Sequence, residues 1–163
     1  MNQVFFKMSG AGNDFIVADN RNGLIPEDGR RKWIEQLCQR AVSVGADGVL
    51  LVEPPEHEGN FRMRYYNSDG GEAESCGNGA RCIARFAHAI GAAPSEMTFE
   101  TQAGLYQARV FDDNEVEIGM TDPISLRRSV ELEIANAPEI TVDYLNTGVP
   151  HAVAWLDNVE PVD

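Results

Sequence analysis

Residues 67–90 read NSDGGEAESCGNGARCIARFAHAI, a polar, glycine-containing loop that runs directly into an apolar helix. In the second half of this stretch, apolar side chains recur every three or four residues, which is the spacing of one helix face. Cys82 and Phe86 widen that face, so we expect the helix over 77–90 to be largely enclosed by the rest of its domain. The apolar positions behind this expectation are Ala80, Ile83, Ala84, Ala87 and Ile90.

Short strands are expected on both sides of this helix. Runs rich in β-branched and aromatic residues, bounded by Gly, Pro, Asn and Asp, are typical of strands. A second amphipathic helix is expected over about 28–42, so strands outnumber helices. The expected strands are 4–8, 15–18, 49–52 and 61–66 before the enclosed helix, and 97–101, 105–111 and 116–120 after it.

We expect a domain boundary at Thr121-Asp122-Pro123. Beyond it the sequence predicts three more strands, at 130–134, 140–145 and 152–156, without a helix for them to pack against. We therefore interpret 1–120 as an N-terminal domain and 121–163 as the start of an incomplete second domain. The alternative is a loose terminal tail, because chain ends are commonly disordered.

Composition limits the classes of partner. The chain has 163 residues, of which 43% are hydrophobic, so it can bury a core. It holds 26 acidic and 13 basic residues, a formal net charge of −13, which argues against nucleic acid or an anionic membrane as partner. No apolar run of about 18 residues occurs, and the start MNQVFFKMSG lacks the pattern of an export signal, so we expect a soluble cytoplasmic protein.

The three cysteines are Cys38, Cys76 and Cys82. Their odd number and the expected reducing compartment argue against a disulfide framework. Cys38 falls on the apolar face of the helix over 28–42, and Cys82 lies on a different helix face from Cys76, so both are interpreted as packing residues. Zinc held by Cys76, Cys82 and His88 is a weak alternative, because the spacing matches no common ligand pair and a fourth ligand is missing.

Cys76 stands where the polar loop becomes the helix. The first amides of a helix have no partner within it and carry partial positive charge, which favours the thiolate form of a cysteine placed there. The same free amides, at Gly77 and Asn78, can hold a carboxylate. A carboxylate held beside a thiolate suits abstraction of an α-proton, provided that the site stabilises the carbanion and excludes water. The alternative is a structural cysteine near a turn.

Four motifs lie in order along the chain: GAGNDF at 10–15, GADG at 45–48, NSDG at 67–70 and CGNGARC at 76–82. In this order and spacing they resemble the diaminopimelate epimerase family. The resemblance implies an α+β fold in which a β-barrel-like sheet wraps around a central helix. This chain would form the first of two similar domains and part of the second, with the active site in the cleft between them.

By the same resemblance, Cys76 matches the family's first catalytic cysteine, and a second cysteine on the other domain faces it across the substrate's α-carbon. The substrate would be LL-diaminopimelate, converted to the meso form in lysine biosynthesis without pyridoxal phosphate, metal or another cofactor. His151 matches a histidine near the cleft that would orient or tune the thiols, and the full-length protein would be a homodimer. The residues that match substrate-binding positions are Asn13, Asn67, Gly77 and Asn78.

The sequence departs from the family pattern at two positions and at its end. Some relatives have glutamine in place of Gly48 and asparagine in place of Val149, so those two substrate contacts do not carry over. The family's second cysteine motif and its Glu-Arg pair lie beyond residue 163, and no cysteine follows Cys82. We therefore expect a fragment of a longer protein that is inactive by itself.

Other interpretations remain open at this point. An asparagine in a glycine-rich loop can simply form a turn, and His151 can be satisfied by a hydrogen bond at a strand end. The function can also be that of a related isomerase of the proline racemase or phenazine-biosynthesis type. A non-catalytic domain that binds a ligand or partner is the third possibility, and in it the reactivity of Cys76 would be ordinary.

Overall fold

The computed structural model describes residues 4–113, 115–133 and 139–158. It divides into two units, Met1–Thr121 and Asp122–Asp163.

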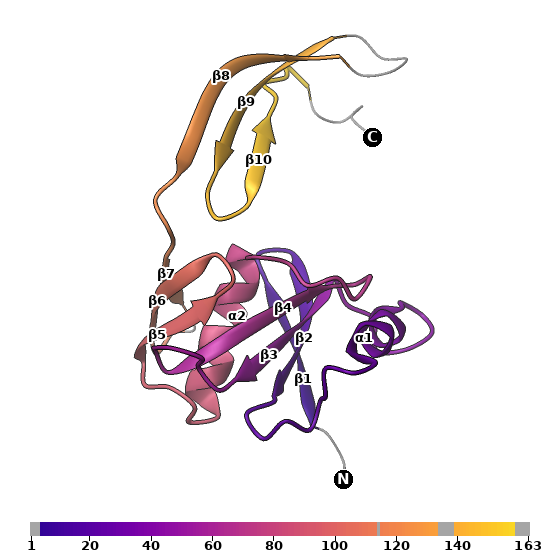
Figure 1. The fold of residues 1–163 in the computed structure, drawn as a ribbon, viewed down its shortest axis with the longest axis vertical. Coiled ribbons are helices and arrows are strands. Elements are labelled where there is room, and N and C mark those ends of the chain that lie inside the picture. Colours follow the sequence, from indigo (N-terminus) through magenta and orange to yellow (C-terminus); the bar gives the residue numbers. More distant parts are fainter. Residues whose placement is uncertain (1–3, 114, 134–138, 159–163) are drawn as a thin grey trace. The chain divides into compact units, whose positions relative to one another are not determined.

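A mixed sheet of seven strands forms most of the first unit (Figure 1), and its strands follow one another in chain order across the sheet. Neighbouring strands are antiparallel except for two parallel pairs, β2 with β3 and β4 with β5. The strands are β1 (Phe5–Gly10), β2 (Asn13–Asp19), β3 (Gly48–Glu53), β4 (Phe61–Asn67), β5 (Glu96–Thr101), β6 (Gly104–Val110) and β7 (Val116–Gly119).

Helix α2 (Gly77–Ala89) lies inside the curve of this sheet. It contacts strands from both ends of the sheet, including β1, β2, β6 and β7, so the sheet wraps around it as a half-barrel. Its apolar face, with Ile83 and Ala84 fully buried, packs against Phe15, Leu50 and Tyr106 from three different strands. The predicted α+β fold, with a sheet wrapped around a central helix, is confirmed.

Helix α1 (Arg30–Cys38) packs on the other side of β3. A second apolar cluster forms there between Ile34 and Cys38 of α1 and Val49 and Leu51 of β3. Strand β3 is therefore covered on both faces, as its uninterrupted apolar run predicts.

The expected helix over 28–42 is too long by one turn. The chain is extended at Gln39, and Ala41 has a left-handed conformation with φ of 62°. The backbone amides of Gly45 and Ala46 return to bond the carbonyls of Leu37 and Cys38 at 3.0 and 3.2 Å. Because these bonds satisfy the last carbonyls of the helix, the helix ends at Cys38. The expected helical conformation of residues 39–42 was wrong.

The second unit is a three-stranded antiparallel sheet in the order β10-β9-β8. Its strands are β8 (Ile124–Leu132), β9 (Ile140–Asn146) and β10 (Pro150–Val153). Strand β8 begins six residues before the expected start at 130, and its pairing with β9 shifts register near Ser125 and Ser129, where φ is 60° and 53°. The expected strand end at 134 and residues 159–163 lie outside the described residues. That this unit begins a second domain stays a prediction.

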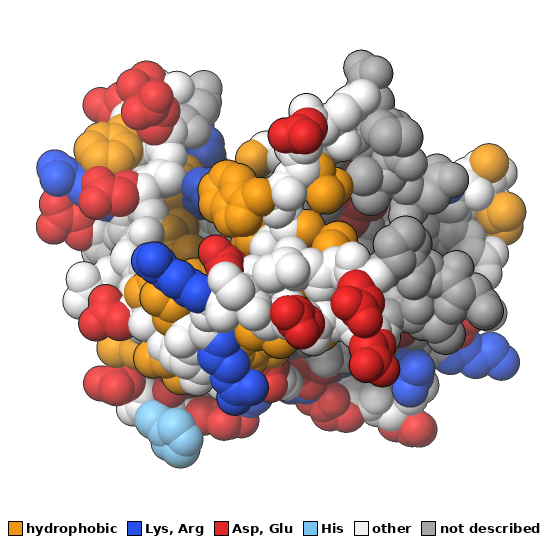
Figure 2. All heavy atoms as spheres, turned by 90° about the horizontal axis from the view of Figure 1, so that it is seen from above, with side chains coloured by type: hydrophobic (Ala, Val, Ile, Leu, Met, Phe, Trp, Pro, Cys, Tyr) orange, Lys and Arg blue, Asp and Glu red, His pale blue; other side chains and the backbone are white. Residues whose placement is uncertain are grey.

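Acidic side chains are spread over the face of the chain drawn in Figure 2, and the basic ones on it lie among them. Neither helix of the described residues is long and apolar enough to cross a bilayer. The expectation that nucleic acids and membranes are not partners stays a prediction.

Replacing Ile83 by alanine tests the central role of α2. The side chain is fully buried, and such a deletion typically costs about 2–5 kcal/mol of the free energy of unfolding because a cavity remains. Urea denaturation of the wild-type chain and Ile83→Ala measures this loss. Val42→Ala is the control, since Val42 is 78% exposed and its truncation should change the free energy of unfolding by less than about 0.5 kcal/mol.

Candidate active site

Cys76 is the N-cap residue of α2. Its backbone is extended, with φ of −152° and ψ of 113°, and its sulfur accepts a hydrogen bond from the Gly79 amide at 3.4 Å. The Cys76 carbonyl accepts the first helical bond, from Ala80, at 2.7 Å. The thiol thus takes the place that a serine or aspartate side chain usually fills at a helix start, where the helix dipole favours negative charge.

The loop before Cys76 is anchored to the sheet. The Ser75 hydroxyl, which is buried, hydrogen-bonds the fully buried hydroxyl of Tyr106. The Ala73 amide donates to the carbonyl of Tyr65 at 2.9 Å, and an ion pair joins Glu72 to Arg64. These contacts hold the loop against the sheet, so the sheet as well as the helix determines the position of the Cys76 thiol.

Two amides of the first turn remain available. Within the described residues, the N–H groups of Gly77 and Asn78 have no backbone acceptor, as is normal for the first turn of a helix. They lie directly after Cys76 in the chain. A carboxylate bound to them would therefore lie near the sulfur.

Asn13 and Asn78 meet at this turn, although 65 residues separate them. The side-chain nitrogen of Asn78 donates to Oδ1 of Asn13 at 2.9 Å, and the Asn13 nitrogen donates to Asp47 at 2.9 Å. The structure thus brings three of the predicted substrate-binding residues to the helix start, namely Asn13, Gly77 and Asn78.

Asn67 lies at the same end of the sheet. It is the last residue of β4 and pairs with Gly48, the first residue of β3, which in turn pairs with Phe15 near the start of β2. Its side chain is exposed, and Oδ1 accepts a hydrogen bond from the Tyr65 hydroxyl at 2.7 Å. Asn67 is therefore open to a ligand, with its amide oriented by Tyr65.

Tyr65 is a residue of this region that the sequence patterns did not single out, because it reads as one position of an alternating strand. Its ring meets Phe15 edge-on, with 6.0 Å between centroids. Burial, and next the charge of the neighbouring Cys76, raise the pKa of Tyr65 to about 12. The phenol therefore stays protonated and can donate a hydrogen bond at neutral pH.

Gly48 explains one departure from the family pattern. A Cβ atom on this residue would lie 2.4 Å from the Tyr66 carbonyl oxygen and 2.9 Å from Cε2 of Tyr65. The backbone of this chain leaves no room for a side chain there, so the glutamine of some relatives has no counterpart in this site.

Two carboxylates, those of Asp14 and Asp47, lie next to Asn13. Asp14 forms ion pairs with Arg40 at 2.5 Å and with Lys7 at 2.8 Å, and their hydrogen bonds hold the pKa of that carboxyl well below its usual range. The pKa of Asp47 is also lowered, first by the hydrogen bond from Asn13 and then by that from the Asp14 amide. Both carboxylates are ionised at neutral pH.

His151 lies on β10 in the second unit and is exposed. Its Nδ1 is 2.7 Å from the Val149 carbonyl and 3.4 Å from the Thr147 hydroxyl. Its support of the thiols stays a prediction. The carbonyl of Val149 is engaged by this contact and by the Thr147 amide at 3.2 Å.

The other two cysteines are buried in the apolar clusters, as predicted, Cys82 inside the half-barrel and Cys38 beneath α1. Burial raises the pKa of both thiols. Among the described residues, no group of three or more His, Cys, Asp or Glu side chains is arranged to hold a metal ion.

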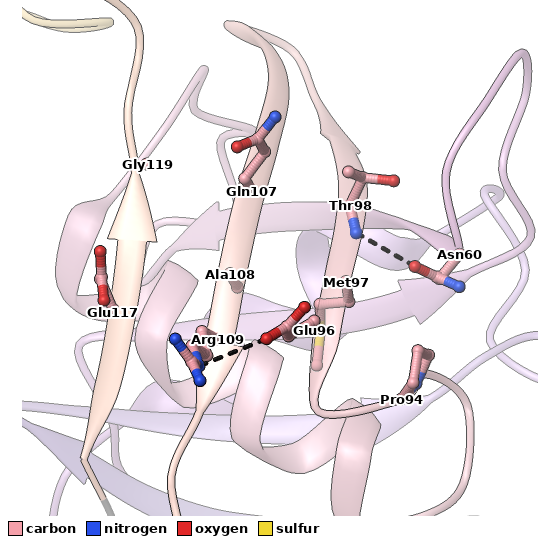
Figure 3. A pocket seen from close by; sticks show the side chains of 10 residues that line it. All are labelled: Asn60, Pro94, Glu96, Met97, Thr98, Gln107, Ala108, Arg109, Glu117 and Gly119. Atoms are coloured by element: carbon pink, nitrogen blue, oxygen red, sulfur yellow. Dashed lines mark hydrogen bonds and ion pairs between the residues drawn. The ribbon is translucent and has the colours of Figure 1, made fainter.

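A hollow in the first unit lies away from the start of α2. It is a cavity of about 550 Å³ over β5, β6 and β7, on the face where the polar side chains of these strands point away from α2 (Figure 3). Its charged pair, Glu96 and Arg109, is already matched at 3.4 Å, and no thiol or histidine lines it. The chemistry of the chain is concentrated at the start of α2 instead.

Comparison with known proteins identifies the family of the chain. A family model described as diaminopimelate epimerase matches residues 5–126. The chain belongs to this family. The diaminopimelate epimerase of Hydrogenobaculum sp. (strain Y04AAS1) is 37% identical over 161 residues, which cover 94% of this chain and 58% of that protein. That of Chlorobaculum tepidum is 39% identical over 158 residues, covering 96% and 58%. The chain thus spans somewhat more than half the length of these curated relatives.

Solved structures share the fold of this diaminopimelate epimerase family chain. A probable proline racemase from Agrobacterium radiobacter K84 aligns with a TM-score of 0.73 at 17% identity, covering 92% of this chain and 51% of that one. A phenazine biosynthesis protein of the PhzF family from Bacillus anthracis aligns with a TM-score of 0.65 at 20% identity, covering 94% and 56%.

Thiol labelling should separate the three cysteines. Cys76 is partly exposed at a helix start, whereas Cys38 and Cys82 are each 4% exposed and have raised pKa values. Because the thiolate is the reactive form, iodoacetamide at pH 7 should modify Cys76 at least about tenfold faster than the other two. Peptide mass spectrometry over time measures the three rates. Equal labelling rates for the three cysteines in the folded chain would contradict the interpretation of Cys76 as the reactive thiol of the site.

Spectrophotometric titration tests the environment of Tyr65. The absorbance of tyrosinate in the wild-type chain, minus that in Tyr65→Phe, should rise with a midpoint near the pKa of about 12. Because the folded state favours the neutral phenol, the stability that Tyr65 contributes is fully present below the unfolded pKa of about 10 and is lost as the pH rises through 12. A difference titration centred near 10 would show that the ring is solvated.

Proposed function

We propose that this chain supplies one half of the active site of a cofactor-independent diaminopimelate epimerase, with Cys76 as a catalytic thiol. The reaction is the interconversion of LL- and meso-diaminopimelate, in lysine biosynthesis. The observation that supports this most is the thiol at the N-cap of α2, next to two amides that are free to hold a carboxylate. Membership of the family agrees with it.

In the proposed mechanism, the amides of Gly77 and Asn78 hold the α-carboxylate of the substrate beside the sulfur of Cys76. In one direction the Cys76 thiolate takes the α-proton, and the electron pair left on carbon is stabilised by the amide dipoles around the carboxylate. A second thiol delivers a proton to the opposite face of the same carbon. In the reverse direction the two thiols exchange roles, so no metal, pyridoxal phosphate or redox partner is consumed.

The second thiol must come from outside this stretch of sequence, because no cysteine follows Cys82 and both Cys38 and Cys82 are buried. We therefore propose that the chain alone does not epimerise. Asn13 and Asn67 bind polar groups of the substrate, and His151 supports the thiols from the second unit. The full-length protein is a cytoplasmic homodimer that binds this small molecule and neither nucleic acid nor membrane.

A related isomerase of the proline racemase or phenazine-biosynthesis type is the second candidate. The shared fold favours it. The solved structures are 20% or less identical to this chain, and they carry the fold without the substrate. Activity on proline but not on diaminopimelate would favour this candidate.

Loss of the α-proton in heavy water tests the proposed reaction. The full-length protein that carries this chain should replace the α-proton of LL-diaminopimelate with deuterium, as followed by proton NMR, and the chain alone should not. Cys76→Ser should lower the rate of exchange by at least about 10³-fold, because a hydroxyl is a far weaker acid than a thiol and is not ionised near pH 7.

Cys38→Ala is the matched control for this experiment. Cys38 lies in the cluster beneath α1, so its removal should leave the exchange rate within about twofold of the wild type. Full exchange activity in Cys76→Ser, or no exchange by a folded and reduced full-length protein, would contradict the proposed function. A non-catalytic binding domain would then remain.

A further inference from the structure

We propose that Asp47 and Arg81 are positioning residues of this site, an inference that rests on the proposed epimerase function. They hold the side-chain amides of Asn13 and Asn78 in one orientation. In that orientation each amide keeps one N–H that can donate to a ligand.

The guanidinium of Arg81 can donate hydrogen bonds but cannot accept them. It contacts the Asn78 side chain, so the Asn78 atom that it meets has to be the amide oxygen. The other atom of the same amide is therefore nitrogen, and it donates to Asn13 at 2.9 Å. The Asn13 atom that receives this bond must in turn be the oxygen.

Asp47 lies at the other end of this series of hydrogen bonds, and it acts as an acceptor where Arg81 acts as a donor. Asp47 is ionised and can only accept. One of its oxygens accepts from the Asn13 nitrogen at 2.9 Å and from the Asp14 amide at 3.0 Å. Its other oxygen accepts from Arg40 at 2.8 Å.

Arg81 can only donate hydrogen bonds and Asp47 can only accept them. Neither amide between them can therefore exchange the positions of its oxygen and nitrogen without losing a hydrogen bond. A flipped Asn13 would place its oxygen against the Asp47 carboxylate, and a flipped Asn78 would place its nitrogen against Arg81. Either arrangement leaves unpaired polar groups in a half-buried place, which costs more than an ordinary hydrogen bond contributes. The orientation of both amides is thus set by charged residues that lie away from the thiol.

The consequence concerns the ligand. Each amide oxygen already accepts one hydrogen bond, and each amide nitrogen keeps one N–H. A group that binds these free N–H donors must accept hydrogen bonds, as a carboxylate does and an ammonium group does not. The pair lies at the first turn of α2, where the backbone amides also favour an anion. The site thus selects the carboxylate end of an amino acid at the helix start.

The test compares Asp47→Ala and Asp47→Asn in the full-length protein. Alanine removes the acceptor, frees the Asn13 amide and should raise KM for LL-diaminopimelate about tenfold, with kcat within about threefold of the wild type. Asparagine can keep its oxygen toward Asn13 by turning its nitrogen toward Arg40, whose side chain is 60% exposed and able to move away. It should restore KM to within about threefold of the wild type.

Arg81→Met removes the donor at the other end and should raise KM in the same sense, so the test does not depend on the folding of one variant. Glu100→Ala is the matched control. The Glu100 carboxylate also accepts backbone amides, those of Glu56, His57 and Glu58 at 2.6, 2.7 and 2.8 Å, but it lies on β5 outside the site. Its loss should leave KM unchanged.

A readout independent of turnover comes from this chain itself. In the ¹⁵N-labelled protein, the side-chain NH₂ signals of Asn13 should have two well-separated proton shifts, and these should converge in Asp47→Ala and Arg81→Met. If the wild-type protein is active and KM is unchanged in both Asp47→Ala and Arg81→Met, the inference is overturned and the proposed function is not. An inactive wild-type protein would overturn the proposed function, and the positioning role would fall with it.

Discussion

The start of α2 depends on one hydrogen bond, from the Gly79 amide to the sulfur of Cys76. A helix that is enclosed by a sheet still has amides without partners in its first turn, and these must meet an acceptor or a ligand. In this chain a thiol caps the helix where a hydroxyl or carboxylate is more usual. The same contact therefore has two roles. It begins the central helix of the fold, and it places a sulfur at the positive end of that helix.

The sheet adds the rest of the site by bringing three strand ends to this point. Asn13 begins β2, Gly48 begins β3 and Asn67 ends β4, and the register places the three segments side by side. Polar side chains at strand ends can face a ligand without disturbing the apolar clusters on either side of the strands. Residues that form the core and residues that can meet a ligand thus lie within a few positions of each other on these strands. Phe15 and Leu50 are fully buried, while Asn67 is exposed.

The sequence was sufficient where structure is local. The enclosed helix was predicted because its apolar spacing extends over three turns, and β3 because an uninterrupted apolar run needs cover on both faces. The end of α1 was missed because it depends on amides of Gly45 and Ala46, which return from beyond the helix. Asp47 was part of a quoted motif, but its bond to Asn13 joins residues 34 positions apart, and no spacing rule shows such a contact. Likewise Tyr65 could be read only as a strand residue until β4 was placed beside the thiol.

Gly48 has a consequence for how sites of this architecture can diverge. The absent side chain lets the backbones of β3 and β4 and the ring of Tyr65 occupy volume that a larger residue would fill. The Tyr65 phenol that borders this position donates to Asn67 at 2.7 Å, so its hydrogen bond is made within β4. A side chain at position 48 would therefore require the β4 backbone and the Tyr65 ring to move away from β3.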